Sequence, residues 1–330
     1  MSRRHTRVLS DSDVRSLLTM PDAIAVMRGA FVDLSGGGAR VPVRQLLRAP
    51  EAEAAMFTMP AFRTTDAAFG VKIITLHDRN PKRGLPRSLA KVLVFDADNG
   101  DLIGLLDGEH LTAVRTGAGS GVATEELARR DSRTVAIFGG GRQAETQLEA
   151  VCAVRPIDTV YVYTRSEHTA SAFAERMSPR LDVNIIPHPP RDRIRDADII
   201  CSATTSTQPV FLDEELGAGV HINGVGSYSP GMVEVPATTV GRSVVVVDQR
   251  EAALAEAGDL IQAIAAGAFA ADAIHAELGE VVAGSSPGRS SDAEVTFFKS
   301  VGNAIQDLAV ASFLLAQAEE RDVGTTFLLR

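Results

Sequence analysis

Three consecutive glycines, Gly139 to Gly141, lie in the stretch of this sequence that points most directly to ligand chemistry. Apolar and β-branched residues at 134–138 precede them, and Arg142, Gln143 and further helix-favouring residues follow. The pattern predicts a strand, a tight turn and the start of a helix. Such a turn lets the backbone approach a phosphate, and the helix start offers unpaired N–H groups and the positive end of a dipole. The predicted ligand is a dinucleotide pyrophosphate.

The glycine motif alone also fits an ordinary turn between a strand and a helix. A second predicted strand at 159–164 adds evidence, because dinucleotide-binding folds contact the ribose at its end. The acidic residue that binds the ribose 2′-hydroxyl of NAD is missing there, and Thr164, Arg165 and Ser166 offer a cation and hydroxyls instead. These groups suit a 2′-phosphate. The sequence therefore favours NADP over NAD, with NAD as the alternative.

Short apolar runs that end in polar residues or glycine follow the glycine motif, as is typical of parallel strands buried on both faces. They lie at 183–186, 198–204, 220–226 and 243–248. In such sheets ligands bind at the carboxyl ends of the strands. We therefore expect Thr204, Thr205, Val225 and Gly226 to lie beside the cofactor.

The first 110 or so residues lack this βαβ alternation and predict a sheet-rich domain. Residues 69–76 alternate as a strand does and bring Lys72 onto one face with Ile74 and Leu76. Strands at 88–95 and 102–106, joined by an Asn-Gly turn, are predicted to be antiparallel neighbours. A last helix from Lys299 to about Ala318 is expected to return to this domain.

Length and composition narrow the class of protein. The 330 residues favour two domains. A net charge of −9 without a basic run argues against a nucleic-acid partner. The sequence has neither an apolar run of roughly 20 residues nor a signal peptide, so we expect no membrane association and a cytoplasmic location. Cys152 and Cys201 stand alone and the histidines lack ligand spacing, so no metal site is predicted.

Several motifs together resemble the ornithine cyclodeaminase and μ-crystallin family over nearly the whole chain. They are Val71-Lys72, Gly84-Leu-Pro, Leu106-Asp-Gly, Leu111-Thr-Ala-Val-Arg-Thr-Gly-Ala, Phe138-Gly-Gly-Gly-Arg-Gln-Ala and Phe298-Lys-Ser-Val-Gly-Asn-Ala-Ile-Gln-Asp-Leu. The resemblance implies an α/β fold. It has a Rossmann domain at 116–296 and a sheet-rich α+β substrate and dimerisation domain formed by 1–115 with 297–330. It also implies a homodimer that associates through the sheet of the second domain.

The resemblance further implies roles for individual residues. Arg44, Lys72 and Arg115 match residues that hold the carboxylate of an amino or imino acid, and Val301 matches one that touches substrate. With the glycine motif and the strand ends, the predicted cofactor site comprises Arg87, Ser88, Arg115, Gly139, Gly141, Arg142, Gln143, Thr164, Arg165, Ser166, Thr204, Val225, Gly226 and Ser300.

Two departures from the family's cyclodeaminases indicate the reaction. Tyr228 stands where related cyclodeaminases and alanine dehydrogenases place an aspartate, and Phe57 and Thr58 precede Met59-Pro60 where cyclodeaminases have a carboxylate. Without these acids, a buried distal ammonium of a diamino acid would cost several kcal/mol. A cyclic imine carries no such ammonium. We therefore expect a substrate pocket with cations and no acidic group.

The sequence thus predicts an NADPH-dependent reductase of a cyclic α-imino acid, Δ1-pyrroline-2-carboxylate or Δ1-piperideine-2-carboxylate. The alternatives are an NAD-dependent ornithine or lysine cyclodeaminase or amino acid dehydrogenase, and a non-enzymatic protein that binds NADPH and a small ligand. Lys72, Arg44, Arg115 and Tyr228 are the predicted catalytic residues, with Lys72 assisting protonation of the imine nitrogen.

Each of these residues also has a structural interpretation. Lys72 and Arg44 could be surface cations, and Tyr228 could pack over the substrate instead of donating a hydrogen bond to it. Arg115 lies among small helical residues, where a bulky cation is unexpected unless it is paired. Asp307, on the last helix, is a candidate structural partner for an arginine.

Overall fold

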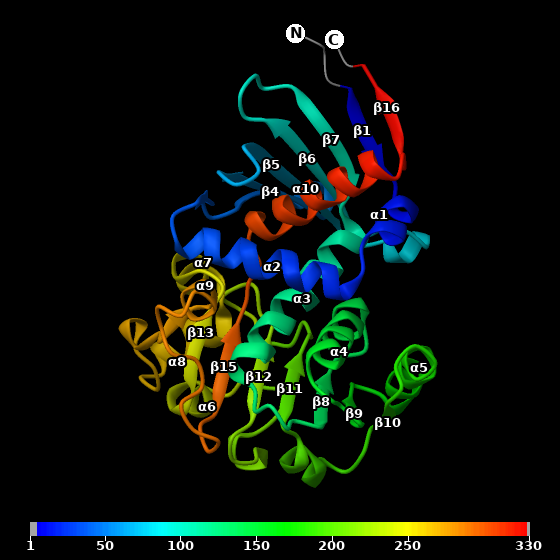
Figure 1. Cartoon of the computed structure of the whole chain (residues 1–330). Coiled ribbons are helices and arrows are strands. Elements are labelled where there is room, and N and C mark those ends of the chain that lie inside the picture. Colours follow the sequence, from blue (N-terminus) through cyan, green and yellow to red (C-terminus); the bar gives the residue numbers. More distant parts are fainter. Residues whose placement is uncertain (1–4, 329–330) are drawn as a thin grey trace. The chain divides into compact units, whose positions relative to one another are not determined.

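The computed structural model describes residues 5–328, which form two compact units with one eight-stranded sheet in each (Figure 1). One unit comprises Met1–Arg115 with Asn303–Arg330, and the other comprises Thr116–Gly302. The first boundary falls inside helix α3 (Glu109–Leu127). The second lies later in the chain than the predicted position after residue 296.

The sheet of the first unit has the order β16-β1-β7-β6-β5-β4-β2, with β3 paired to β4. Apart from the parallel pair β1 and β7, its pairings are antiparallel. This confirms the prediction for the strands around 69–106. The strands are β1 (Thr6–Leu9), β2 (Ala39–Arg40), β3 (Gln45–Ala49), β4 (Ala54–Arg63), β5 (Ala68–His77), β6 (Ser88–Asp96), β7 (Leu102–Asp107) and β16 (Thr325–Phe327).

The first unit also contains helices that pack with this sheet. They are α1 (Asp11–Leu17), α2 (Met20–Ser35), α10 (Ala304–Glu320) and the short 3-10 helices η1 (Pro50–Ala52) and η2 (Pro81–Arg83). Helix α10 packs on β4, β5 and β6, and glycine makes this approach close, because a Cβ on Gly70 would lie 2.8 Å from Leu308 Cδ1. The expectation that this helix starts at Lys299 is wrong, because Lys299 ends a strand of the other unit and Asn303 is the N-cap.

The second unit is a doubly wound parallel sheet with the order β10-β9-β8-β11-β12-β15-β13-β14. Six of its strands follow the 3-2-1-4-5-6 order of dinucleotide-binding folds, so the predicted Rossmann architecture is confirmed. The strands are β8 (Thr134–Phe138), β9 (Thr159–Tyr163), β10 (Asn184–Pro187), β11 (Ile199–Ser202), β12 (His221–Gly224), β13 (Val244–Val247), β14 (Ala276–Glu277) and β15 (Thr296–Lys299).

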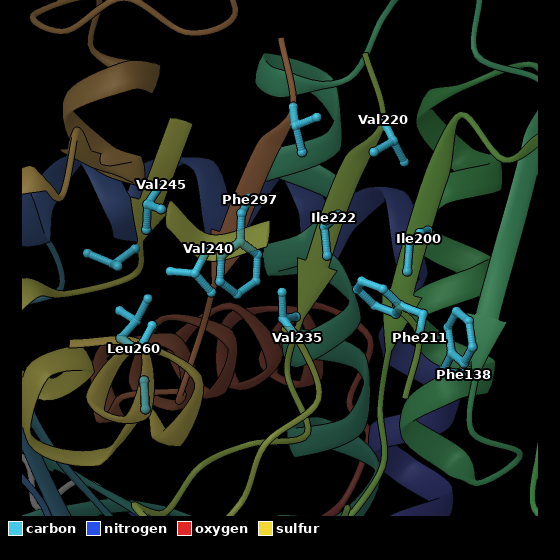
Figure 2. Packing of buried hydrophobic residues seen from close by; sticks show 14 of the residues in the cluster. Phe138, Ile200, Phe211, Val220, Ile222, Val235, Val240, Val245, Leu260 and Phe297 are labelled. Atoms are coloured by element: carbon cyan, nitrogen blue, oxygen red, sulfur yellow. The ribbon is translucent and has the colours of Figure 1, made fainter. Parts of the chain in front are cut away.

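Helices cover both faces of this sheet, so its strands are apolar on both sides. They are α4 (Arg142–Val154), α5 (Glu167–Met177), α6 (Ala237–Arg242), α7 (Arg250–Glu256), α8 (Gly258–Ala265), α9 (Leu278–Val282) and the 3-10 helices η3 (Arg191–Asp196), η4 (Asp213–Glu215) and η5 (Ala271–Ala273). Leu148 of α4 and Phe173 of α5 pack with Val135 on one face. On the other face, Figure 2 shows Ile200, Ile222 and Phe297 of neighbouring strands meeting a second apolar layer.

The part of this second cluster that Figure 2 labels stabilises the strands from which the loops of the site extend. It contains Phe138, Ile200, Phe211, Val220, Ile222, Val235, Val240, Val245, Leu260 and Phe297 (Figure 2). Each is buried, and burying such a side chain contributes about 1.5–3 kcal/mol. This burial stabilises the strands up to the residues at which the loops at their carboxyl ends begin.

Candidate active site

The glycine turn between β8 and α4 fits a phosphate. Gly139 has φ +119°, and a Cβ there would lie 2.6 Å from the carbonyl oxygen of Ala203, so only glycine fits without strain. Gly141 is the N-cap of α4, no side chain caps this helix, and a Cβ on Gly141 would meet nothing within 4 Å. This 13-residue helix thus starts without a side-chain cap and with open space beside its N-cap residue. This arrangement suits the pyrophosphate of a dinucleotide.

The other groups predicted around this turn differ in how they are engaged. Arg142 and Arg165 are exposed, and the Oε1 atom of Gln143 is buried without a hydrogen-bond partner in the described structure. Thr164 Oγ1 donates to the carbonyl oxygen of Ser166 at 2.6 Å. Ser166 Oγ accepts from Thr169 N and so caps α5. Of the three residues at the end of β9, Arg165 is therefore the one that offers a charged group to the solvent side.

The loops at the carboxyl ends of β11 and β12 carry the predicted Thr204, Val225 and Gly226. The two strands are direct neighbours, so these residues come together at one edge of the sheet. Tyr228, on the same loop as Gly226, is 36% exposed. Glu234, which sequence reasoning did not single out, is fully buried and accepts hydrogen bonds from both loops.

The loop after β15 contains the predicted Ser300 and Val301, both largely buried. Asp248, just beyond the end of neighbouring β13, holds this loop. Its Oδ2 atom accepts from Ser300 Oγ at 2.7 Å, Val301 N at 3.1 Å and Gly302 N at 2.8 Å. Asp248 was also missed from the sequence, where it appears only as the polar end of an apolar run.

In the first unit, Lys72 and Arg115 converge on one carboxylate. The alternation of β5 turns Lys72 towards the buried face, where its side chain is fully enclosed. Its Nζ atom lies 2.6 Å from Asp307 Oδ2, and Arg115 Nε donates to Asp307 Oδ1 at 3.0 Å. Arg115 also donates to Gln306 Oε1. Two of the predicted carboxylate-binding cations are thus joined through the first turn of α10.

Asp307 overturns one expectation from the sequence. The substrate pocket was expected to contain no acidic group, yet the two cations assigned to it share a buried carboxylate that is 1% exposed. The interpretation of Asp307 as a structural partner for an arginine holds for Arg115 but leaves out Lys72. Both carboxylate oxygens are engaged by cations, so Asp307 neutralises one of them.

Burial controls the proton affinity of Lys72. Loss of hydration is the largest effect and lowers the pKa of Lys72 from 10.5 to about 7, with the charge of Arg115 acting in the same direction. Asp307 opposes this shift, and Arg44 adds to it. A lysine with a pKa near neutrality exchanges its proton readily, which is the property required of a general acid.

The remaining predicted residues of this unit lie nearer its surface. The guanidinium of Arg44 lies 5.9 Å from the centroid of the Phe57 ring. Arg87 and Ser88 are exposed, and Arg87 Nε donates to Asp78 at 2.7 Å. The structure thus brings Lys72 and Arg115 together and places Arg87 in an exposed ion pair.

Two amides next to Asp307 were missed by sequence reasoning. Asn303 is the N-cap of α10 but its side chain makes no capping bond, and both of its polar atoms are buried without a partner in the described structure. Gln306 Nε2 is in the same state. A buried amide without a partner costs about 1–3 kcal/mol. The Gly-Asn-Ala-Ile-Gln-Asp run was the available signal, because positions 303 and 307 lie one helical turn apart.

Two kinds of feature are absent from residues 5–328. None of the helices there is long and apolar enough to span a membrane. No group of three or more histidine, cysteine or acidic side chains is arranged there to hold a metal ion.

Comparison with known proteins gives full-length matches. The model of the ornithine cyclodeaminase/mu-crystallin family matches residues 4–322. The Δ1-pyrroline-2-carboxylate reductase of Bacillus thuringiensis subsp. konkukian (strain 97-27) is 40% identical over 319 residues, which cover 96% of this chain and 98% of the relative. These matches confirm the resemblance found in the motifs.

Solved structures agree with this assignment. Thermococcus litoralis Δ1-pyrroline-2-carboxylate reductase in complex with NADH and L-proline gives a TM-score of 0.92 at 40% identity, covering 97% of this chain and 99% of that one. An archaeal alanine dehydrogenase dimer with bound NAD gives a TM-score of 0.93 at 32% identity, covering 99% and 100%.

Proposed function

Because the chain belongs to the ornithine cyclodeaminase/mu-crystallin family, we propose that it reduces a cyclic α-imino acid to the cyclic amino acid with NADPH. It is an NAD(P)-dependent oxidoreductase that acts on carbon–nitrogen bonds. The proposed substrate is Δ1-pyrroline-2-carboxylate, and Δ1-piperideine-2-carboxylate is its larger-ring alternative.

The observation that carries this proposal is the buried cluster of Lys72, Arg115 and Asp307. When Lys72 is protonated, it and Arg115 place two positive charges against the one negative charge of Asp307. The excess positive charge suits the substrate carboxylate, to which Arg44 adds a further cation. Asp307 is already paired twice, so it supplies no counter-ion for the distal ammonium of a diamino acid. A diamino acid therefore finds no free counter-ion in this cluster, although the cluster contains an acidic group.

In the proposed mechanism, Arg115 and Arg44 hold the carboxylate, and Lys72 gives a proton to the ring nitrogen. The uncapped start of α4, with Gly139, Gly141 and Gln143, would hold the cofactor together with Thr204 and Gly226. A bound reduced nicotinamide would supply a hydride to the imine carbon. Together with the proton from Lys72, this would convert the C=N bond into a CH–NH unit. Lys72 then regains a proton from solvent.

Arg165 supports the preference for NADPH. It is the exposed cation at the end of β9, where an acidic residue would select NAD. The relative from Thermococcus litoralis was solved with NADH, so NADH is the cofactor to compare. Exchanging Arg165 for glutamate should reverse the preference if this residue binds the 2′-phosphate.

An assay of cofactor oxidation tests the proposed function. Purified protein is given NADPH or NADH with pyrroline, piperideine and open-chain ketimine carboxylates, and the loss of absorbance of the reduced cofactor is followed. The proposal requires oxidation with a cyclic substrate. The second candidate is an NAD-dependent amino acid dehydrogenase or cyclodeaminase. The similarity to alanine dehydrogenase is the observation that supports it. Turnover of alanine, ornithine or lysine with no cyclic imine reduction would select it.

We also propose a homodimer that forms through the sheet of the first unit. The register aligns Phe62, Phe69 and Phe95 across β4, β5 and β6, on the face opposite to buried Lys72. Phe69 is 49% exposed although its ring packs on Phe62. Apolar sheet faces of this kind serve as interfaces.

Both cysteines are free thiols, which suits the reducing cytoplasm as the proposed location.

A further inference from the structure

We propose that Glu234 is a positioning residue whose carboxylate fixes the backbone positions of the cofactor-binding loops after β11 and β12. This inference rests on the proposed function, because it assumes that Thr204 and Gly226 lie beside the cofactor. Glu234 belongs to neither strand and lies in the connection between β12 and α6 that also contains Tyr228. It extends the site to a buried carboxylate that reaches Thr204 and Gly226 through their backbone N–H groups.

The carboxylate of Glu234 joins two loops through their backbones. Its Oε1 atom accepts from Thr204 N at 2.6 Å, and its Oε2 atom accepts from Gly226 N at 2.7 Å and Ser227 N at 3.2 Å. Ser202 Oγ, at the end of β11, donates to Oε2 at 3.1 Å. One side chain therefore fixes the spacing between the first residues of both loops.

Glu234 is itself held by a second buried carboxylate. Asp259 Oδ1 accepts from the backbone N–H groups of Glu234 at 2.7 Å and Val235 at 3.1 Å. Its other oxygen lies 2.9 Å from Lys299 Nζ, with both side chains fully buried. The anchor of the loops thus continues through Asp259 to the end of β15, a neighbour of β12 in the sheet.

The cost of this arrangement indicates a role beyond packing. Glu234 is fully buried, and burial is the largest effect on its carboxyl and raises its pKa. A buried carboxyl group is tolerated only where the fold supplies hydrogen-bond partners. Here three of the four donors are backbone N–H groups of the loops. These hydrogen bonds fix the backbone positions of Thr204 and Gly226.

The test compares Glu234→Gln with a matched variant. The glutamine keeps the shape but places an NH₂ group against one of the loops. Asp198→Asn is the control, because Asp198 accepts from Arg133 N at 2.8 Å and Thr134 N at 3.0 Å, so it anchors backbone in the same way at the amino ends of β8 and β11. NADPH affinity is measured by fluorescence titration, and Tm is measured without cofactor.

We expect both variants to lose thermal stability but only Glu234→Gln to raise the Kd for NADPH, by about tenfold. An unchanged Kd for Glu234→Gln, or an equal rise for Asp198→Asn, overturns the positioning role and leaves the proposed function intact. If the unaltered protein binds neither NADPH nor NADH, the proposed function fails and this inference fails with it. If Glu234→Gln does not fold, Ser202→Ala removes one donor to the same carboxylate and should raise the Kd in the same direction.

Discussion

Lys72 carries the central chemical claim at the scale of single residues. A lysine on a strand is usually solvated, but here the side chain is enclosed and its charge is balanced by Asp307. The alternation in β5 made the strand predictable. Its pairing partner was not, because Asp307 is remote in sequence and reaches Lys72 only through the packing of α10 on the sheet. The same holds for Arg115 and Asp307, which are separated by 192 positions.

The first prediction concerns the pH dependence of imine reduction. Lys72 must be protonated to give its proton to the ring nitrogen, and its pKa is lowered to about 7. The rate should therefore be highest below this pH and should fall about tenfold for each further unit above it. The kcat/KM measured from pH 5 to 9 checks this. Lys72→Met should lose most of the turnover and keep its NADPH affinity, and an unaffected rate would remove Lys72 from the mechanism.

The second prediction concerns Asp307→Asn. Loss of the carboxylate removes the charge that holds the pKa of Lys72 up, so the falling limb of the pH profile should move to lower pH. It also leaves two buried cations without a counter-ion, which should cost about 3–5 kcal/mol of stability. Asp66→Asn is the control, because Asp66 pairs with Arg63 elsewhere in the same unit. The control should lower Tm alone, and an unmoved limb in Asp307→Asn would separate Asp307 from the chemistry.

At the scale of elements, the turn between β8 and α4 was predictable because its signals are local. Apolar residues, three glycines and helix formers follow one another without interruption. The carboxylates that hold the other loops were not predictable. Nothing in the sequence around Glu234 or Asp248 reveals which backbone N–H groups donate hydrogen bonds to them. The start of α10 was also misplaced, because Lys299 reads as helical but lies in β15.

The third prediction separates the two roles of glycine in this turn. Gly139→Ala forces a side chain into a left-handed conformation and against a carbonyl oxygen, so it should cost about 1–3 kcal/mol of stability as well as cofactor binding. Gly141→Ala meets no protein atom within 4 Å, so it should lower Tm less than Gly139→Ala, through the weaker N-cap preference of alanine alone. It should still weaken NADPH binding, because its methyl group points into the space proposed for the phosphates. Equal affinity in Gly141→Ala and the unaltered protein would argue against that placement.

At the scale of the whole molecule, the sequence predicted two units because one part shows βαβ alternation and the other shows antiparallel patterning. The proposed homodimer rests on the apolar face that the sheet of the first unit exposes around Phe69. Phe69→Glu should convert a dimer into a monomer in light scattering after gel filtration, because it buries a charge at the proposed interface. Leu254→Glu, on α7 of the second unit, is the control and should remain dimeric. A dimer that tolerates Phe69→Glu would place the interface elsewhere.

Isotope transfer tests the reductase assignment most directly. NADPH carrying deuterium at both C4 positions of the nicotinamide is incubated with the protein and Δ1-pyrroline-2-carboxylate, and the amino acid product is examined by mass spectrometry. The account predicts proline with one deuterium at the α-carbon and one equivalent of NADP⁺. Unlabelled product, or proline formed from ornithine with release of ammonia and no net oxidation of the cofactor, would contradict it.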